Sequence, residues 1–175
     1  MVTSHIYLVG FMGIGKTTIA RKLAQTLQVP FIDTDKAISE QTGFTISQLF
    51  DQFGEEHFRK LEADFIRSLS DEKPKVVATG GGLPCYFDNM QYMNTHGITV
   101  YLSATPAFIF SRLKQSKTPR PLLLKHTHAS LPQVIADMLK QREPHYLLSK
   151  VKIDMPEKSV QSAVNTIISS ILKQL

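Results

Sequence analysis

The chain has 175 residues, of which 42% are hydrophobic and 20% charged, a composition typical of a globular domain and unlike that of a disordered chain. Its 20 basic and 15 acidic residues are interspersed, so the formal net charge of +5 suits small anionic ligands as well as nucleic acid. A single cysteine, Cys85, excludes an internal disulfide bond and favours a reducing cytoplasm, and the apolar start is too short to span a membrane. We expect one domain over residues 1–175.

Short apolar runs alternate with longer helical patterns along the chain. The runs that we expect to form strands are residues 5–10, 30–32, 75–79, 98–102 and 151–154. Helical spacing of apolar residues predicts a helix over 19–27, one from near Ser130 that Pro144 disturbs, and one over 160–175. This alternation predicts a doubly wound α/β domain with a parallel sheet, whose ligands bind at the carboxyl ends of the strands.

The segment "GFMGIGKT" matches the pattern G-x-x-x-x-G-K-[ST] with Gly10, Gly15, Lys16 and Thr17. In this pattern backbone N–H groups surround phosphate oxygens, the lysine reaches the outer phosphates and the hydroxyl binds Mg²⁺. The predicted strand before it and helix after it are the context that the motif requires. A plain glycine turn with a solvated lysine is the alternative. The motif favours a nucleoside triphosphate site and leaves open whether the protein is a kinase, a GTPase or an ATPase.

Asp33 and Asp35 follow the second apolar run in "PFIDTD". If the strand continues, both carboxylates lie at its carboxyl end and point to the same side. We assign Asp33 to Mg²⁺, which prefers oxygen ligands, and Asp35 to a substrate hydroxyl. The alternative is that Asp35 caps a helix formed by "KAISEQ".

Residues 54–69 are predicted to form a helix in which Arg59 lies outside the buried stripe, one turn from both Glu55 and Glu62. The predicted stripe consists of Phe58, Leu61, Phe65 and Leu69. One interpretation is a surface ion pair that contributes under about 1 kcal/mol. The other is an arginine that its acidic neighbours hold in place to bind a carboxylate.

Three glycines, Gly80, Gly81 and Gly82, follow the third predicted strand. Consecutive glycines are tolerated mainly where the backbone approaches a ligand closely or takes a positive φ, so we favour a functional loop over a flexible turn.

Residues 112–128 contain five Lys or Arg and no acidic residue. They predict a mobile lid whose Arg120 brings positive charge to a phosphoryl group, with a solvated basic loop as the alternative. Arg142, in "QREPHY", either converges on the same pocket or is an ordinary surface arginine.

Together these segments resemble the shikimate kinase family over nearly the whole chain. The matching segments are "GFMGIGKTT", "FIDTDKAISEQTG", "ISQLFDQFGEEHFRKLE", "VVATGGG", "RPLL" and "REPHY", in the order and spacing of that family. The resemblance implies a five-stranded parallel sheet of P-loop NTPase type with strand order 2-3-1-4-5. It also implies transfer of the γ-phosphoryl group of ATP to the 3-hydroxyl of shikimate, a step of aromatic amino-acid biosynthesis.

The resemblance implies a role for each matching residue. The implied catalytic residues are Lys16, Asp35 and Arg120. The implied ATP-binding residues are Gly13, Ile14, Gly15, Lys16, Thr17, Thr18, Arg112, Arg120 and Pro156. The implied shikimate-binding residues are Asp35, Arg59, Gly80, Gly81, Gly82 and Arg142, and the implied Mg²⁺ ligands are Thr17 and Asp33. A substrate-binding helical region at about 35–70 and a monomer without nucleic-acid or membrane partners complete this expectation.

Two rival interpretations remain. One is another small-metabolite P-loop kinase, such as a gluconate or nucleoside-monophosphate kinase. The other is a nucleotide-dependent switch, because "DQFG" at 51–54 fits the loose D-x-x-G pattern of GTPases, although no N-K-x-D guanine motif occurs in the sequence.

Overall fold

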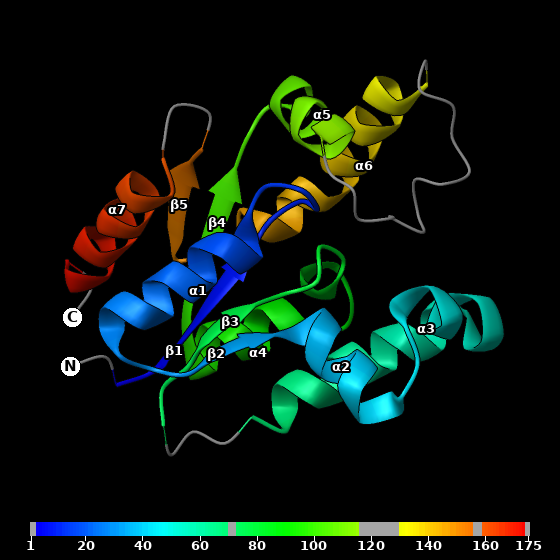
Figure 1. The fold of residues 1–175 in the computed structure, drawn as a ribbon, viewed down its shortest axis with the longest axis horizontal. Helices are drawn as coiled ribbons and strands as arrows, with labels where there is room; N and C mark the ends of the chain where they lie inside the picture. The colour runs from blue at the N-terminus through cyan, green and yellow to red at the C-terminus, as the bar shows by residue number, and fades with distance from the viewer. Residues whose placement is uncertain (1–2, 70–72, 116–129, 156–158, 174–175) are drawn as a thin grey trace.

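The computed structural model describes residues 3–69, 73–115, 130–155 and 159–173 (Figure 1). Its strands are β1 (His5–Val9), β2 (Phe31–Asp33), β3 (Val76–Ala78), β4 (Gly97–Ser103) and β5 (Val151–Asp154). They form one parallel sheet in the order β2-β3-β1-β4-β5. The predicted strands, their order and the doubly wound α/β architecture are confirmed.

Helices cover both faces of the sheet. They are α1 (Lys16–Leu27), α2 (Thr34–Thr42), α3 (Ile46–Arg67), α4 (Asn89–His96), α5 (Pro106–Gln115), α6 (Leu131–Tyr146) and α7 (Val160–Leu172), with a short 3₁₀ helix η1 (Leu83–Cys85). Figure 1 shows α1 in front of the strands and α4 behind them, while α7 packs against α1 and β5. No described helix has the length and apolar character that crossing a membrane requires.

The core forms around β1 because all its residues are buried, as in a strand with helices on both faces. α1 adds the apolar face predicted from its spacing, in which Ile19 and Leu23 are buried. Full burial of such a side chain stabilises the fold by about 1.5–3 kcal/mol. The core therefore fixes the loop between β1 and α1 at both of its ends.

A second, smaller apolar cluster joins α2 to α3. It consists of Ile38, Leu49 and Phe58 with partly buried neighbours. Thr45 begins α3 with a capping box to Gln48, and Gly54 interrupts the helix with a φ of 81°. These two helices occupy the region expected at about 35–70 and carry an apolar cluster distinct from that of the sheet.

Two details differ from the sequence predictions. The buried face of α3 includes Arg59 and Glu62, whereas Leu61 and Phe65 are only partly buried. The spacing of apolar residues does not reveal this face, because two of its buried residues, Arg59 and Glu62, are charged. In addition, α6 continues two residues past Pro144 before it ends at Tyr146.

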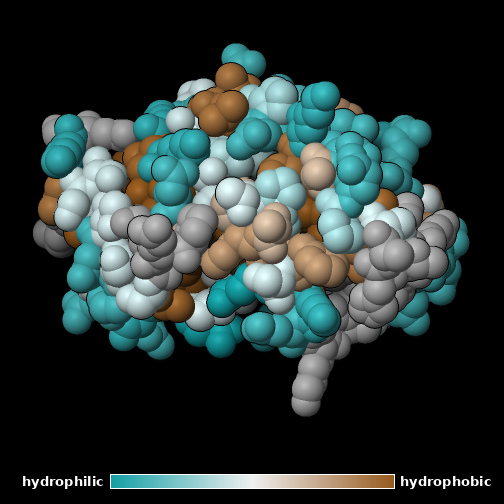
Figure 2. All heavy atoms as spheres, turned by 90° about the horizontal axis from the view of Figure 1, so that it is seen from above, coloured by the Kyte–Doolittle hydropathy of each residue, from teal (hydrophilic) through white to brown (hydrophobic). Residues whose placement is uncertain are grey.

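Seen from above, the surface carries hydrophobic areas separated by hydrophilic ones (Figure 2). This mixture agrees with the interspersed charges of the sequence. Most of the expected lid, residues 116–128, lies outside the described residues, and its first part, residues 112–115, belongs to α5.

Candidate active site

The loop between β1 and α1 has the geometry of an anion-binding cradle. Gly15 precedes α1 with a φ of 106°, which a side chain would disfavour. The first N–H groups of α1 have no partner within the helix, so they favour an anion at this end. The ammonium of Lys16 donates hydrogen bonds to the carbonyl oxygens of Gly10 at 2.7 Å and Phe11 at 2.9 Å, and its side chain is buried. These bonds hold the positive charge over the loop.

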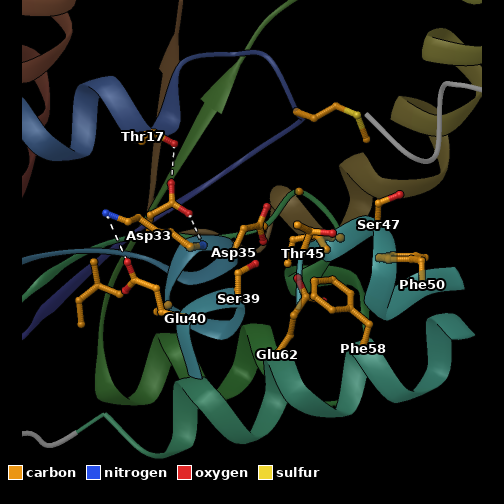
Figure 3. Close-up of a pocket in the computed structure, with 18 of the residues that line it drawn as sticks. Thr17, Asp33, Asp35, Ser39, Glu40, Thr45, Ser47, Phe50, Phe58 and Glu62 are labelled. Atoms are coloured by element: carbon orange, nitrogen blue, oxygen red, sulfur yellow. Dashed lines mark hydrogen bonds and ion pairs between the residues drawn. The ribbon is translucent and has the colours of Figure 1, made fainter. Parts of the chain in front are cut away.

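Thr17 and Asp33 meet beside this cradle. The Thr17 hydroxyl donates a hydrogen bond of 2.7 Å to Asp33 Oδ2 (Figure 3). The other oxygen, Asp33 Oδ1, accepts from the backbone N–H of Lys36 at 3.2 Å, so Asp33 caps α2. The alternative in which Asp35 caps this helix is therefore wrong. The strand also does not continue to Asp35, because β2 ends at Asp33 and Asp35 lies in the first turn of α2.

The paired oxygens of Thr17 and Asp33 fit a magnesium ion, because Mg²⁺ takes hard oxygen ligands and keeps several waters. Within the described ranges no group of three or more His, Cys, Asp or Glu could hold a metal. A magnesium ion that also binds phosphate oxygens requires fewer protein ligands than that.

A cavity of about 360 Å³ follows the cradle toward α5. It is lined by Gly13, Gly15, Lys16, Thr17, Thr18 and Arg112, among others. The Ile14 side chain is instead buried in the core, so only the backbone of Ile14 is available to a ligand. The structure therefore brings Arg112 to the cradle.

A larger cavity of about 1200 Å³ opens next to the first, between the cradle, α2, α3 and the glycine loop. Asp35 projects into it from α2 and Glu62 from α3, with Phe50 and Phe58 on the side away from Thr17 (Figure 3). The expected substrate residues Asp35, Arg59, Gly80, Gly81, Gly82 and Arg142 all line this cavity.

Arg59 is fixed by two acidic residues of its own helix. Its Nη1 donates to Glu62 Oε2 at 2.7 Å, and its Nε and Nη2 donate to Glu55 Oε1 at 3.1 and 2.7 Å. The Arg59 side chain is only 3% exposed, so the interpretation as a surface ion pair is wrong. Burial alone would lower the Arg59 pKa, but the charge of Glu62 and the hydrogen bonds outweigh burial and raise it. The guanidinium therefore stays charged.

For the Glu62 carboxyl group, burial outweighs the attraction of its charged partner. Burial raises its pKa to about 7, because the attraction of Arg59 only partly offsets the loss of water and the nearby Asp35 adds repulsion. Its Oε1 is buried without a hydrogen-bond partner among the described residues. Glu62 Oε1 and Asp35 Oδ1 both lie beside Gly80, so this side of the cavity holds two neighbouring carboxyl groups.

The glycine loop after β3 is held from two directions. The Gly80 N–H donates to the Thr34 hydroxyl at 2.9 Å, and the Tyr146 hydroxyl donates to the Gly81 carbonyl at 2.5 Å. A Cβ on Gly80 would lie 2.5 Å from Glu62 Oε1 and 2.6 Å from Asp35 Oδ1. None of the three glycines has a positive φ, so close approach rather than backbone conformation requires them.

Arg142 reaches the same loop from α6. Its Nη1 is buried without a hydrogen-bond partner among the described residues, and its guanidinium lies 5.7 Å from the Phe11 ring centroid. The structure thus brings two guanidinium groups, Arg59 and Arg142, to one cavity.

The sequence model of the family described as shikimate kinase matches residues 12–172. The chain belongs to the shikimate kinase family. Its members are ATP-using kinases, so the chain is an ATP-dependent phosphotransferase and the interpretation as a nucleotide-dependent switch is wrong.

Individual relatives agree with this assignment. A shikimate kinase from Phocaeicola vulgatus is 38% identical over 98% of this chain and 98% of its own length. The crystal structure of a shikimate kinase from Bacteroides thetaiotaomicron has a TM-score of 0.90 at 36% identity, covering 98% of this chain and 99% of that one. The structure of the Acinetobacter baumannii enzyme in complex with shikimate has a TM-score of 0.89 at 35% identity, covering 98% and 94%.

A gluconokinase from Sinorhizobium meliloti shares the fold with a TM-score of 0.63 but only 16% identity, covering 99% of this chain and 94% of that one. At that identity the likeness concerns the fold alone.

Two residues expected in the shikimate kinase site, Arg120 and Pro156, lie outside the described residues. Sequence reasoning missed Thr34, Tyr86 and Tyr146, whose hydroxyl groups form hydrogen bonds at the site. Their partners are Gly80, Glu55 and Gly81, respectively. Only Tyr146 left a signal, because it lies four residues after Arg142 and so on the same helical face.

Proposed function

We propose that this chain transfers the γ-phosphoryl group of ATP to the 3-hydroxyl of shikimate, giving shikimate 3-phosphate and ADP. One observation carries the proposal: beside the phosphate cradle lies a cavity whose walls include the guanidinium groups of Arg59 and Arg142 and the carboxyl groups of Asp35 and Glu62. Shikimate carries one carboxylate and several hydroxyls, which match these groups in charge and hydrogen bonding.

Arg59 and Arg142 bind the shikimate carboxylate in this proposal. The buried Nη1 of Arg142 supports the role, because a donor without a partner among the described residues is best satisfied by a ligand acceptor. Arg59 supports it through its burial and fixed orientation, since a preoriented guanidinium loses little freedom on binding. The backbone of Gly80, Gly81 and Gly82 forms the neighbouring wall.

Asp35 orients the acceptor hydroxyl and takes its proton as the oxygen attacks the γ-phosphorus. The bond between the γ-phosphorus and the β,γ-bridging oxygen breaks, and ADP leaves with that oxygen. Because the transition state of phosphoryl transfer is loose, alignment and charge neutralisation contribute more than the basicity of Asp35. The position of Asp35 in the first turn of α2, where it lines both the cavity at the cradle and the larger cavity, supports this role.

Lys16 and the first N–H groups of α1 bind the phosphates on the donor side. Thr17 and Asp33 hold Mg²⁺, which when bound with ATP supplies positive charge at the phosphate oxygens. Arg112 borders the nucleotide cavity, and we also propose ATP contacts for Gly13, Ile14, Gly15 and Thr18. Arg120, from a lid over about 112–128, and Pro156 keep their proposed roles as residues outside the described ranges.

An acceptor panel tests the proposed function. The enzyme with ATP and Mg²⁺ is assayed for ADP release with shikimate, gluconate and nucleoside monophosphates, and the product is identified by ³¹P NMR. We expect turnover with shikimate and a phosphate monoester at its 3-position. Turnover with another acceptor but none with shikimate would refute the assignment. Removal of Mg²⁺ by a chelator should abolish turnover.

We also propose that the chain acts as a monomer in the cytoplasm, in aromatic amino-acid biosynthesis, without nucleic-acid or membrane partners. The single cysteine and the interspersed surface charges support the location and the absence of a polyanionic partner.

A further inference from the structure

Three aromatic rings surround the Arg59 guanidinium, and Tyr86 is the nearest. The Cζ of Arg59 lies 4.5 Å from the Tyr86 ring centroid, against 5.4 Å for Phe58 and 5.6 Å for Phe50. A guanidinium over an aromatic face is attracted by the ring quadrupole, and more strongly where water is excluded. Of these three contacts, the one to Tyr86 is therefore the strongest by distance.

Tyr86 also holds Arg59 through a second residue. Its hydroxyl donates a hydrogen bond of 2.9 Å to Glu55 Oε1, the same oxygen that accepts from Nε and Nη2 of Arg59. The Glu55 side chain is 42% exposed, so on its own it would have several rotamers available. The phenol limits this freedom and keeps the oxygen on Arg59. Burial and the bond to Glu55 raise the Tyr86 pKa, so the phenol remains a donor at neutral pH.

The backbone places Tyr86 next to the glycine loop. Tyr86 directly follows η1, which begins right after Gly82, and the Cys85 N–H donates to the Gly82 carbonyl at 2.8 Å. A Cβ on Gly82 would lie 2.5 Å from Arg59 Nη1, so the guanidinium packs directly against the loop. One short segment thus supplies both the backbone and the ring that contact Arg59.

We propose that Tyr86 is a positioning residue for Arg59: its ring and its bond to Glu55 hold the guanidinium in the orientation that binds the acceptor carboxylate. The role of that orientation rests on the proposed function. Tyr86 does not line the acceptor cavity, so it acts on the substrate through Arg59.

The kinetic test compares Tyr86→Leu with Tyr86→Phe. Tyr86→Leu removes both contacts, and we expect the KM for shikimate to rise roughly tenfold while kcat and the KM for ATP change less than about twofold. Tyr86→Phe keeps the ring and should raise the shikimate KM only about threefold. An unchanged shikimate KM in Tyr86→Leu, or an equal rise of both KM values, would overturn the inference.

The matched control is Tyr92→Leu. The Tyr92 ring lies 5.0 Å from the guanidinium of Arg67, a similar pair that lines neither cavity. Its loss should leave both KM values unchanged. Thermal unfolding of all three variants shows whether a kinetic change reflects misfolding.

A measurement on the free protein separates this inference from the proposed function. In ¹⁵N NMR the Arg59 Nε–H signal, assigned by its loss in Arg59→Lys, should exchange with solvent at least about tenfold faster in Tyr86→Leu. If exchange is unchanged, the positioning role is wrong whatever the acceptor is. If exchange quickens but the wild type does not phosphorylate shikimate, only the proposed function fails.

Discussion

Arg59 and Glu62 form an ion pair in which both side chains are buried, with 2.7 Å between Nη1 and Oε2 and exposed fractions of 3% and 1%. Removing two charges from water is costly, so such a pair contributes little net stability, yet loss of one partner is strongly destabilising. Its geometry leaves Glu62 Oε1 facing Asp35 and the Arg59 guanidinium facing the cavity. We therefore infer that the ion pair serves to orient the Arg59 guanidinium and the Glu62 carboxyl group, and contributes little to the stability of the fold.

Glu62 should make the stability of the protein depend on pH. Its pKa is about 7 in the folded chain and 4.5 for an ordinary glutamate, so between these values the folded state retains a proton that the unfolded state has released. Unfolding then releases a proton, and the free energy of unfolding falls as pH rises through this range, by about 3 kcal/mol at most. Urea unfolding from pH 5 to 8 should show this fall in the wild type, relative to Glu62→Gln.

Glu56→Gln serves as the control for that measurement. Glu56 is exposed, and its hydrogen bond to Lys60 lowers its pKa, so it is ionised in the folded and the unfolded chain from pH 5 to 8 and adds no pH dependence there. A difference between wild type and Glu62→Gln that stays constant with pH would contradict the assigned pKa.

Asp35→Asn should nearly abolish turnover while leaving ATP binding intact. The amide keeps the size of the side chain but cannot take the proton, so we expect kcat to fall by about 10²–10⁴. The dissociation constant for ATP, from isothermal titration calorimetry, should change less than about twofold. Asp51→Asn, an exposed change on α3, is the control. A kcat near the wild-type value in Asp35→Asn would remove Asp35 from catalysis.

The two arginines should differ in their effect on folding. Arg142→Ala should raise the shikimate KM by about 10- to 100-fold and lower the melting temperature less than Arg59→Ala, because Arg142 is not the buried ion-pair partner of Glu62. Arg59→Ala should also chiefly raise the shikimate KM, but it leaves Glu62 buried without its cation and should cost about 3–5 kcal/mol of stability.

Lys140→Ala, an exposed change on the same helix as Arg142, should alter neither the KM nor the stability. Equal losses for ATP and shikimate in Arg142→Ala would point to a folding defect rather than a binding role.

Gly80→Ala should impair activity through steric overlap with neighbouring side chains and without backbone strain, since Gly80 has no positive φ. The added methyl group would meet Glu62 Oε1 and Asp35 Oδ1, so we expect kcat/KM for shikimate to fall by about 10², with a stability loss of about 1–3 kcal/mol. Gly43→Ala separates crowding from strain, because Gly43 has a φ of 75° and no atom within 4 Å of an added Cβ. It should lose about 1 kcal/mol without a kinetic change. Wild-type kinetics in Gly80→Ala would mean that the carboxyl groups move aside freely.

The local structure could be predicted from the sequence where the spacing of apolar residues and a chemical motif indicate the same element. The apolar run of β1, the glycine-lysine motif and the helical spacing after it all predict the same local structure, and the structure confirms it. The strand order followed from the resemblance to a family, because spacing alone does not order strands. The site residues Asp35, Arg59 and Arg142 were predicted from motifs and meet in one cavity.

The rest could not be predicted because it depends on contacts distant in sequence. α4 has a polar sequence whose apolar anchors are Met90 and Met93, too few to reveal a periodic stripe. The burial of Arg59 depends on the rings and loop that cover it, and periodicity treats any arginine as exposed. Tyr86 lies in "LPCYF", which has no regular pattern of apolar residues. Its contacts with Glu55 and Arg59 of α3 are visible only in the three-dimensional structure.

Thr34 separates Asp33 from Asp35, and its hydroxyl accepts the Gly80 N–H. In the proposed reaction, three consecutive residues therefore face the metal, the glycine loop and the acceptor hydroxyl. The span from donor to acceptor is set by this one covalent segment and does not depend on how α3 or α6 packs. New acceptors should consequently arise in this scaffold through changes near Arg59 and Arg142, while residues 33–35 resist replacement.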